Sequence, residues 1–289
     1  MKKDQTPTLL KIVRWLYPKV EALVPFLAHR YFIRIFFTPL RYKVPEKEKA
    51  LAARATWFTI NAAGRKIQCY AWGSGPVVLL VHGWAGRGTQ FRKIIETFSN
   101  QGYRVIGFDG PAHGKSEGRK TNIVEFGETL TELFRHFGVP EGIIAHSFGG
   151  SAVLFAAMQG LKVRRLINIA SPTIGDEIIN TYLRAVRGSQ GTKDFFKSYI
   201  RRAYGKSFDE FTSLHFIKNI PKAIDLLLIH DENDEEVILK HARELKRSYP
   251  RARMMITRGL GHTRILKDAM VIEACVTFVR EGRVPEPNG

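Results

Sequence analysis

The chain has 289 residues, 44% of them hydrophobic, and a formal net charge of +18. This is enough apolar sequence for one large α/β domain or two small ones, and so high a charge favours contact with anionic surfaces without indicating a fold. The two cysteines, Cys69 and Cys275, form neither a disulfide framework nor a metal-binding spacing, which is typical of a reducing compartment. We therefore expect a cytoplasmic protein, or one peripheral to the inner face of the membrane.

The first fifty residues form a segment of their own, in which basic residues are interleaved with aromatic ones. Residues 1–50 contain eleven Lys or Arg against four Asp or Glu. These basic residues interrupt every apolar run before it reaches the ~18 residues that a membrane-spanning helix needs. Lys11, Arg14 and Lys19 also break the apolar region that a signal peptide requires. The segment is therefore expected to be neither.

Prolines predict two short helices in this N-terminal arm, separated near Pro18 and Pro25 and ending near Pro39. Two roles stay open for the arm. Basic and aromatic residues together are typical of a segment that lies on an anionic membrane, whereas apolar residues at helical spacing indicate packing on the rest of the protein. Packing is favoured by a helical stripe of apolar residues at Leu9, Ile12, Val13 and Leu16.

From residue 56 onward, strand and helix patterns alternate. The first two strands form a hairpin around an Asn61-Ala62-Ala63-Gly64 turn, and the next is a continuous apolar run, as expected of a strand covered on both faces. This alternation predicts an α/β fold with a mostly parallel, doubly wound sheet and helices on both faces. The strands are expected at residues 57–60, 66–72, 77–81, 103–108, 142–145, 165–170, 224–229 and 252–257.

A serine stands where one of these strands runs directly into a helix. Ser147 follows a short apolar strand, and an alanine-rich helical pattern begins at Ser151. So abrupt a turn strains the backbone, exposes the serine hydroxyl above the sheet, and leaves room only for small residues two positions away. Those positions hold Ala145 and Gly149. A serine that caps an ordinary helix would explain this residue taken alone.

Three motifs together resemble the α/β-hydrolase superfamily. They are His82-Gly83-Trp84, Asp109-x-Pro111-Ala112-His113-Gly114-x-Ser116 and Ala145-His146-Ser147-Phe148-Gly149, and they occur in the order and spacing of that superfamily. The resemblance covers residues 56–282 and implies a serine hydrolase of the esterase or lipase type, with Ser147 as nucleophile. It implies an oxyanion hole formed by the backbone amides of Trp84 and Phe148. His82, His113 and His146 are interpreted as structural or pocket-lining residues, because the base is expected later in the chain.

The catalytic acid and base are expected after the serine, in that order. The predicted strand at 224–229 leads into His230-Asp231-Glu232-Asn233-Asp234, where the resemblance implies that Asp234 is the acid. Asp231 stands where many superfamily members have glycine, so it stays the alternative. His262 follows the last strand in a glycine-containing loop that can carry it back over the strand ends, and it is the expected base.

The alternation stops between Ser171 and Pro221, where three stretches have helical patterns. The resemblance implies a small helical cap at about residues 174–221, which would shape the substrate pocket. If its aromatic residues line that pocket, they predict a partly apolar substrate, whereas as mere packing they would only hold the helices to the core. These residues are Phe195, Phe196, Tyr199, Tyr204, Phe208, Phe211 and Phe216.

The resemblance thus implies hydrolysis of a carboxylic ester, or a related acyl bond, in a small substrate with an apolar part. It implies no metal and no organic cofactor. Thioesterase, lactonase, peptidase, C–C hydrolase and perhydrolase chemistry use nearly the same residues and stay open, as does a non-catalytic membrane-surface protein anchored by residues 1–50. Nucleic-acid binding is not expected, because no helix-turn-helix or RNP-type pattern accompanies the positive charge.

Overall fold

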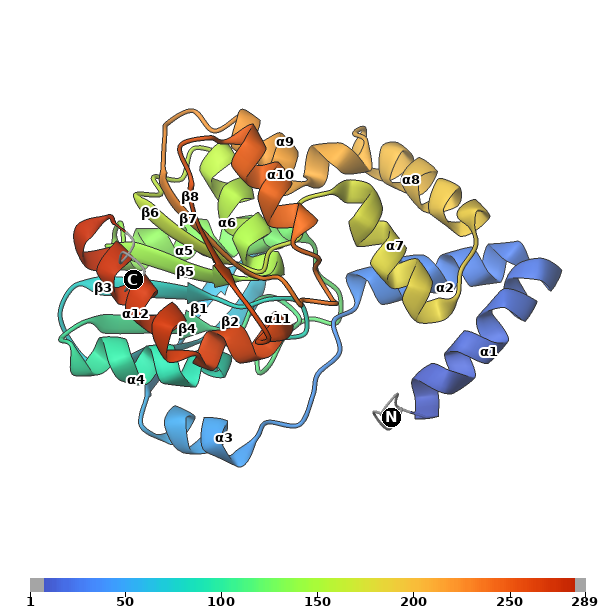
Figure 1. Cartoon of the computed structure of the whole chain (residues 1–289). Coiled ribbons are helices and arrows are strands. Elements are labelled where there is room, and N and C mark those ends of the chain that lie inside the picture. Colours follow the sequence, from blue (N-terminus) through green and yellow to red (C-terminus); the bar gives the residue numbers. More distant parts are fainter. Residues whose placement is uncertain (1–7, 284–289) are drawn as a thin grey trace.

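A mostly parallel eight-stranded sheet forms the centre of the molecule (Figure 1). The computed structural model describes residues 8–283, and the side chains of residues 10–283. The strand order is β1-β2-β4-β3-β5-β6-β7-β8, with β2 antiparallel to both β1 and β4 and the other pairs parallel. This confirms the predicted fold class. The strands are β1 (Thr56–Ala62), β2 (Arg65–Trp72), β3 (Val77–Val81), β4 (Arg104–Phe108), β5 (Gly142–His146), β6 (Arg165–Ile169), β7 (Asp225–Asp231) and β8 (Arg253–Thr257).

Helices cover both faces of this sheet and bury it. One apolar cluster joins α5, α6, α9 (Ser213–Lys218) and α10 to one face, and a second joins α3, α4 and α12 to the other. The central strands contribute to both clusters, because successive side chains of a strand point to opposite faces. In β5, Ile143 belongs to the first cluster and Ile144 to the second. The helices that flank the sheet are α3 (Glu46–Ala53), α4 (Arg92–Asn100), α5 (Ile123–Phe137), α6 (Phe148–Met158), α10 (Lys240–Ser248) and α12 (Ala269–Glu281).

A helical cap lies between β6 and β7 in the chain, and the N-terminal arm packs beside it (Figure 1). A third apolar cluster joins Tyr17 and Phe32 of the arm to Leu183 and Phe196 of the cap. The arm thus packs chiefly on the cap, which sequence patterns could not specify. The elements are α1 (Thr8–Leu23) and α2 (Pro25–Phe37) in the arm, α7 (Gly175–Val186), α8 (Gln190–Tyr204) and α9 (Ser213–Lys218) in the cap, α11 (Gly261–Arg264), and 3₁₀ turns at Gly88–Phe91, Phe208–Phe211 and Ile265–Lys267.

Polar contacts also fix the arm to the cap. Glu21 of α1 accepts hydrogen bonds from the Thr192 hydroxyl (2.6 Å) and from the backbone amide of Ser189 (3.1 Å), at the start of α8. Burial raises the pKa of Glu21, but these hydrogen bonds outweigh it and hold the pKa below its ordinary value. Arg14 donates to the carbonyl oxygen of Ala185 at the end of α7 (3.1 Å).

The arm differs from its prediction in two respects. Pro18 does not separate two helices, because α1 continues through it to Leu23, and the break falls at Val24. The apolar stripe is also rotated from the predicted one. Ile12 and Leu16 are 53% and 45% exposed, whereas Tyr17 is buried against the cap. Proline in a helix costs one backbone hydrogen bond, which the packing of α1 on the cap offsets. None of the described helices has the length and apolar character needed to cross a membrane.

Candidate active site

Ser147 lies on a strained turn between β5 and α6, at the centre of the sheet. Its φ of +53° is in the left-handed region, which costs a residue with a side chain ~1–3 kcal/mol. Hydrogen bonds hold the turn in this conformation: the Ser147 amide donates to the carbonyl oxygen of Ile169 (2.8 Å), and its carbonyl oxygen accepts from the Ser171 hydroxyl (2.6 Å). The neighbouring strand β6 and the residues just after it therefore hold this turn in its strained conformation.

The turn fits only because its neighbours are small. A Cβ atom on Gly149 would stand 2.3 Å from the carbonyl oxygen of Val81, and one on Gly83 would stand 2.8 Å from the Cβ of Ser147. Ala145 is fully buried. Small residues are therefore required here because the end of β3 and the loop after it lie so close to the turn that carries Ser147.

Asp234 and His262 meet in a hydrogen bond, in which His262 Nδ1 donates to Asp234 Oδ2 over 2.7 Å. The other carboxylate oxygen accepts from the amides of Glu236 and Val237, each at 2.9 Å. Burial raises the pKa of Asp234, but the hydrogen bond and charge of His262 and these two amides outweigh it, so the pKa lies below its ordinary value. The ionised carboxylate holds the imidazole in the tautomer whose Nε2 is free to accept a proton.

Asp231, the alternative acid, has a different task in the same loop. Its side chain ties the strand ends to the segment that carries His262, and it makes no hydrogen bond to that imidazole in the part of the chain that the structure describes. Burial raises the pKa of Asp231, but its hydrogen bonds outweigh it and lower the pKa. The carboxylate accepts from the amides of Asn233 (3.0 Å), Leu260 (3.0 Å) and Gly261 (2.9 Å) and from the hydroxyl of Thr257 (2.8 Å).

His146, immediately before the serine, positions the backbone of the expected base. Its Nε2 lies 2.9 Å from the carbonyl oxygen of His262, and the two ring centroids are 4.7 Å apart. Burial lowers the pKa of His146 to about 3, so the ring is neutral and Nε2 carries the hydrogen that it donates. Its role is therefore structural, and it ties the last loop directly to β5.

Two further neutral histidines shape the loop that follows β3. His82 Nε2 accepts from the amide of Gly110 (2.8 Å) while its Nδ1 donates to the carbonyl oxygen of Gly83 (2.7 Å). His113 Nε2 accepts from the amide of Ala85 (3.0 Å). Burial lowers the pKa values of His82 and His113 to about 4 and about 3. Both rings are therefore uncharged, and the amide of Ala85 already donates to His113.

Trp84 and Phe148, whose amides are the expected oxyanion donors, both line the cavity that contains Ser147. Phe148 is the first residue of α6, and the first amides of a helix have no acceptor within it. The helix N-terminus also carries a partial positive charge that favours an anion. The two side chains meet edge to face, with ring centroids 5.2 Å apart. Both residues therefore border the cavity beside the serine, and the Phe148 amide lies at a helix N-terminus.

His241 of α10 is a cavity-lining residue that the sequence did not indicate. Its Nδ1 accepts from the amides of Thr173 (2.9 Å) and Ile174 (3.2 Å), where the chain leaves β6 for the cap. Burial lowers its pKa to about 4. Because Nδ1 is an acceptor, the hydrogen of this neutral ring is on Nε2. His241 therefore fixes the start of the cap and brings a hydrogen-bond donor to the cavity wall.

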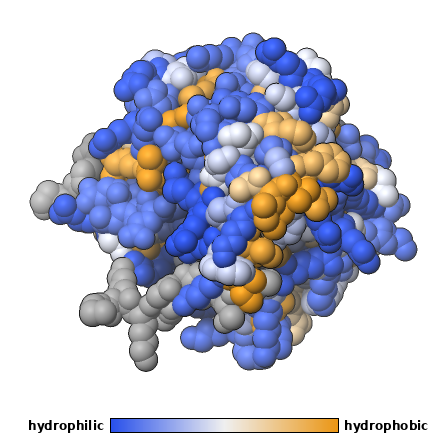
Figure 2. Space-filling view, turned by 90° about the vertical axis from the view of Figure 1, so that its right-hand side faces the viewer, coloured by the Kyte–Doolittle hydropathy of each residue, from blue (hydrophilic) through white to orange (hydrophobic). Residues whose placement is uncertain are grey.

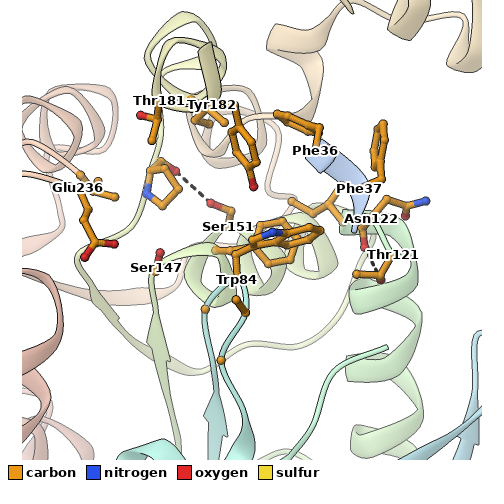
Figure 3. Close-up of a pocket in the computed structure, with 18 of the residues that line it drawn as sticks. Phe36, Phe37, Trp84, Thr121, Asn122, Ser147, Ser151, Thr181, Tyr182 and Glu236 are labelled. Atoms are coloured by element: carbon orange, nitrogen blue, oxygen red, sulfur yellow. Dashed lines mark hydrogen bonds between the residues drawn. The ribbon is translucent and has the colours of Figure 1, made fainter. Parts of the chain in front are cut away.

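A cavity of about 560 Å³ opens above Ser147 and also contains His262. Its wall is made by the core, the cap and the arm. Figure 3 shows Phe36 of α2 beside Tyr182 of α7, whose hydroxyl points into the cavity, with Phe37 beyond Phe36. Burial raises the pKa of that hydroxyl, so it remains protonated. The sequence did not assign Phe36 and Phe37 to the pocket, because their contact with it depends on how the arm folds back.

The aromatic residues of the cap divide between the two predicted roles. Tyr204, Phe208 and Phe211 line the cavity. Phe196 is fully buried between the cap and the arm, and Phe216 is fully buried against the core. Among the described residues, no group of three or more His, Cys, Asp or Glu side chains is placed to hold a metal ion.

Comparison with known families identifies the class of protein that this fold and site define. The profile of the α/β hydrolase fold matches residues 76–197, and a profile described as TAP-like protein matches residues 210–289. An esterase from Exiguobacterium antarcticum superposes with a TM-score of 0.60 at 17% identity, over 78% of this chain and 100% of that one. The chain therefore belongs to the α/β-hydrolase superfamily.

Two curated relatives are more similar in sequence over shorter stretches. The magnesium-chelatase 30 kDa subunit of Rhodobacter capsulatus is 35% identical over 130 residues, which are 41% of this chain and 45% of the relative. A monoglyceride lipase homolog of Monkeypox virus is 24% identical over 111 residues, 36% of this chain and 40% of the relative. The chain thus matches less than half the length of these two proteins.

Proposed function

We propose that the protein is a serine hydrolase that cleaves a carboxylic ester with an apolar acyl part. The observation that carries the proposal is the 2.7 Å hydrogen bond between His262 and Asp234, in loops that open onto the same cavity as Ser147. Ser147 itself sits on a strained turn, as an exposed nucleophile requires. The similarity to an esterase and to a monoglyceride lipase homolog supports the same class of substrate.

The mechanism follows from the groups that surround the serine. Ser147 Oγ attacks the acyl carbon while His262 Nε2 takes its proton, and the carbonyl π electrons move onto oxygen to give a tetrahedral intermediate. The amides of Trp84 and Phe148 stabilise that oxyanion. When the intermediate collapses, the imidazolium gives its proton to the leaving alcohol oxygen, and the acyl group remains on Ser147. Asp234 stays ionised throughout and stabilises the charged imidazole.

Hydrolysis of the acyl-enzyme repeats these steps with water. His262 deprotonates a water molecule that attacks the same acyl carbon, the same two amides stabilise the second oxyanion, and collapse returns the proton to Ser147 Oγ. The products are the carboxylic acid and the free enzyme. No cofactor takes part in either half of the reaction.

The cavity wall indicates the shape and polarity of the substrate. Its aromatic residues come from the arm, the core and the cap, with Phe37 from α2, Trp84 from the loop after β3 and Phe208 from the cap among them. An apolar acyl chain would gain ~0.8 kcal/mol for each methylene that it buries there, which is about fourfold in affinity. The Tyr182 hydroxyl and the Nε2 hydrogen of His241 are two of the polar groups on this wall, and they would hold a substrate oxygen.

A panel of p-nitrophenyl esters of graded chain length tests this proposal. We expect kcat/KM to rise about fourfold per methylene until the cavity is filled and then to fall. The Ser147→Ala variant should hydrolyse none of the esters, whereas Ser99→Ala, which removes a hydroxyl at the end of α4, should retain full activity. If no ester of any length is hydrolysed faster by the wild type than by Ser147→Ala, the proposed function is wrong.

A further inference from the structure

Helix α1 has two apolar faces, of which only one is covered. Tyr17 faces the cap and is 4% exposed, whereas Ile12, Trp15 and Leu16 are 53%, 63% and 45% exposed. Leu23, further along the same side of the helix, is 82% exposed. Because Ile12, Leu16 and Leu23 are four and seven positions apart and Trp15 is next to Leu16, the four residues form one stripe along the helix. The stripe lies opposite the face that packs on α7 and α8.

The exposed apolar surface continues over the turn into α2. Val24, Phe26 and Leu27 are 45%, 58% and 55% exposed. Figure 2, which views the molecule from the side of the arm, shows hydrophobic residues gathered in a band with hydrophilic residues around it. A contiguous exposed surface of this kind marks a site of interaction with a protein or a membrane. We call these seven residues the hairpin patch: Ile12, Trp15, Leu16, Leu23, Val24, Phe26 and Leu27.

Basic side chains border the hairpin patch and contact its aromatic rings. The Lys19 Nζ lies 3.1 Å from the centroid of the Trp15 ring, and the guanidinium of Arg30 lies 5.3 Å from that of Phe26. Phe26, Arg30 and Arg34 are spaced by four residues, so they share one face of α2. Both arginines are exposed. Apolar and aromatic residues flanked by Lys and Arg on an amphipathic helix are typical of a segment that lies in a membrane interface.

The same face of α2 borders a second cavity, of about 900 Å³, between the arm and the core. Five of the residues that line this basic cleft are cationic, and none of the described lining residues is acidic. Such a concentration of positive charge attracts anions and raises their local concentration. The five are Arg30, Arg34, Arg41, Arg119 and Lys120.

We propose that the hairpin patch and the basic cleft dock the protein onto an anionic phospholipid bilayer, with the patch in the interface and phosphate groups opposite Arg30 and Arg34. A second copy of the chain is a poorer occupant. A two-fold contact through the same face would gather Lys19, Arg30 and Arg34 of both copies in one interface, and like charges at an interface are costly. Docking would also bring the bilayer to the helix whose last residues, Phe36 and Phe37, line the active-site cavity.

Co-sedimentation with vesicles tests the docking separately from catalysis, because it can be measured on the inactive Ser147→Ala protein. One set of vesicles contains equal parts of phosphatidylglycerol and phosphatidylcholine, and the other contains phosphatidylcholine alone. We expect strong binding to the anionic set that weakens with salt. Removal of two interfacial charges in Arg30→Gln/Arg34→Gln should weaken binding about 30-fold at low ionic strength. The control pair Lys218→Gln/Lys222→Gln, exposed where the chain passes from α9 to β7, should change it less than about threefold.

The apolar half of the docking surface is tested with Leu23→Ser/Leu27→Ser, against Val139→Ser/Met270→Ser as a matched pair of exposed apolar residues elsewhere. The first pair should lose about tenfold or more in vesicle binding at both low and high salt, and the second should bind as the parent does. The docking proposal fails if the parent stays in the supernatant with anionic vesicles, or if the control pairs lose as much as the test pairs. It also fails if Leu23→Ser/Leu27→Ser converts a dimer in solution to a monomer while vesicle binding is unchanged.

Discussion

Asp234→Asn should remove activity, because it reverses the hydrogen bond that fixes the imidazole of His262. The amide oxygen would keep the bonds from the backbone of Glu236 and Val237, which hold the Oδ1 position at 2.9 Å. The amide nitrogen would then occupy the Oδ2 position, 2.7 Å from His262 Nδ1. Because that nitrogen donates, Nδ1 must accept and the hydrogen moves to Nε2. The imidazole can then no longer take the proton of Ser147.

The loss of activity expected for Asp234→Asn is much larger than that expected for the same change at the neighbouring carboxylate, Asp231. The corresponding change in serine proteases lowers kcat about 10⁴-fold, or ~5.4 kcal/mol of transition-state stabilisation. In Asp231→Asn, the amide NH₂ group would instead face one or two of the N–H or O–H donors that now bind Asp231, and each donor left without an acceptor would cost ~1–3 kcal/mol of stability. That cost falls mainly on the loop at Leu260 and Gly261, so it should lower the free energy of unfolding more than the activity.

The two variants are compared by kcat/KM for a p-nitrophenyl ester and by urea unfolding. We expect Asp234→Asn to lose three to four orders of magnitude in kcat/KM with a folded, cooperative unfolding transition. Asp231→Asn should lose about tenfold or less in activity and be the less stable of the two. A folded Asp231→Asn protein that is as inactive as Asp234→Asn would refute the assignment of Asp234 as the acid.

Three further predictions concern stability and the pocket. Burial lowers the pKa values of His82 (to about 4) and His146 (to about 3) from 6.5, so the unfolded chain binds protons before the folded protein does as the pH falls. In urea unfolding at graded pH, these histidines should leave the free energy of unfolding constant above pH about 6.5 and lower it by up to ~1.4 kcal/mol per pH unit each between about 6.5 and about 4. A free energy of unfolding that increases as the pH falls through that range would contradict the neutral assignment. Phe32→Ala, at a fully buried contact between the arm and the cap, should lower the free energy of unfolding by ~3–5 kcal/mol in the same assay. Deletion of residues 1–37 should lower Tm strongly or make the protein insoluble, and an equally stable, fully active truncated protein would exclude the packing role of the arm. Tyr182→Phe should raise KM for esters with a polar acyl chain by about tenfold and leave purely apolar chains unaffected, and equal effects on both would show that the hydroxyl does not contact substrate.

The sheet and the position of the serine could be read from the sequence because they depend on local patterns. Strands such as Val77–Val81 are apolar runs bounded by glycine-containing loops, and the turn at Ser147 demands small neighbours whatever surrounds it. The choice between Asp234 and Asp231 is different. Asp231 is the last residue of β7 and Asp234 follows it by three positions, so only the three-dimensional path of the loop decides which of the two carboxylates faces His262.

The arm shows the limit of periodicity as a guide to packing. Helix α1 is apolar on two sides, so its pattern does not reveal which side meets the protein, and Ile12 and Leu16 face outward while Tyr17 is buried. Nor could the sequence assign Phe36 and Phe37 to the active-site cavity, more than a hundred residues from Ser147. That contact depends on the arm folding back onto the cap, which is a long-range arrangement without a local signal.

Covalent labelling with a fluorophosphonate tests most directly whether Ser147 is the nucleophile of an intact catalytic centre. The reagent is attacked by an activated serine, and its phosphoryl oxygen occupies the place of the oxyanion. Intact-mass spectrometry should show one label per chain, and peptide mapping should place it on the segment that contains Ser147. The Ser147→Ala protein should fold as the parent does and take up no label. Labelling that persists in Ser147→Ala, or that falls on another serine of the parent, would contradict the assignment.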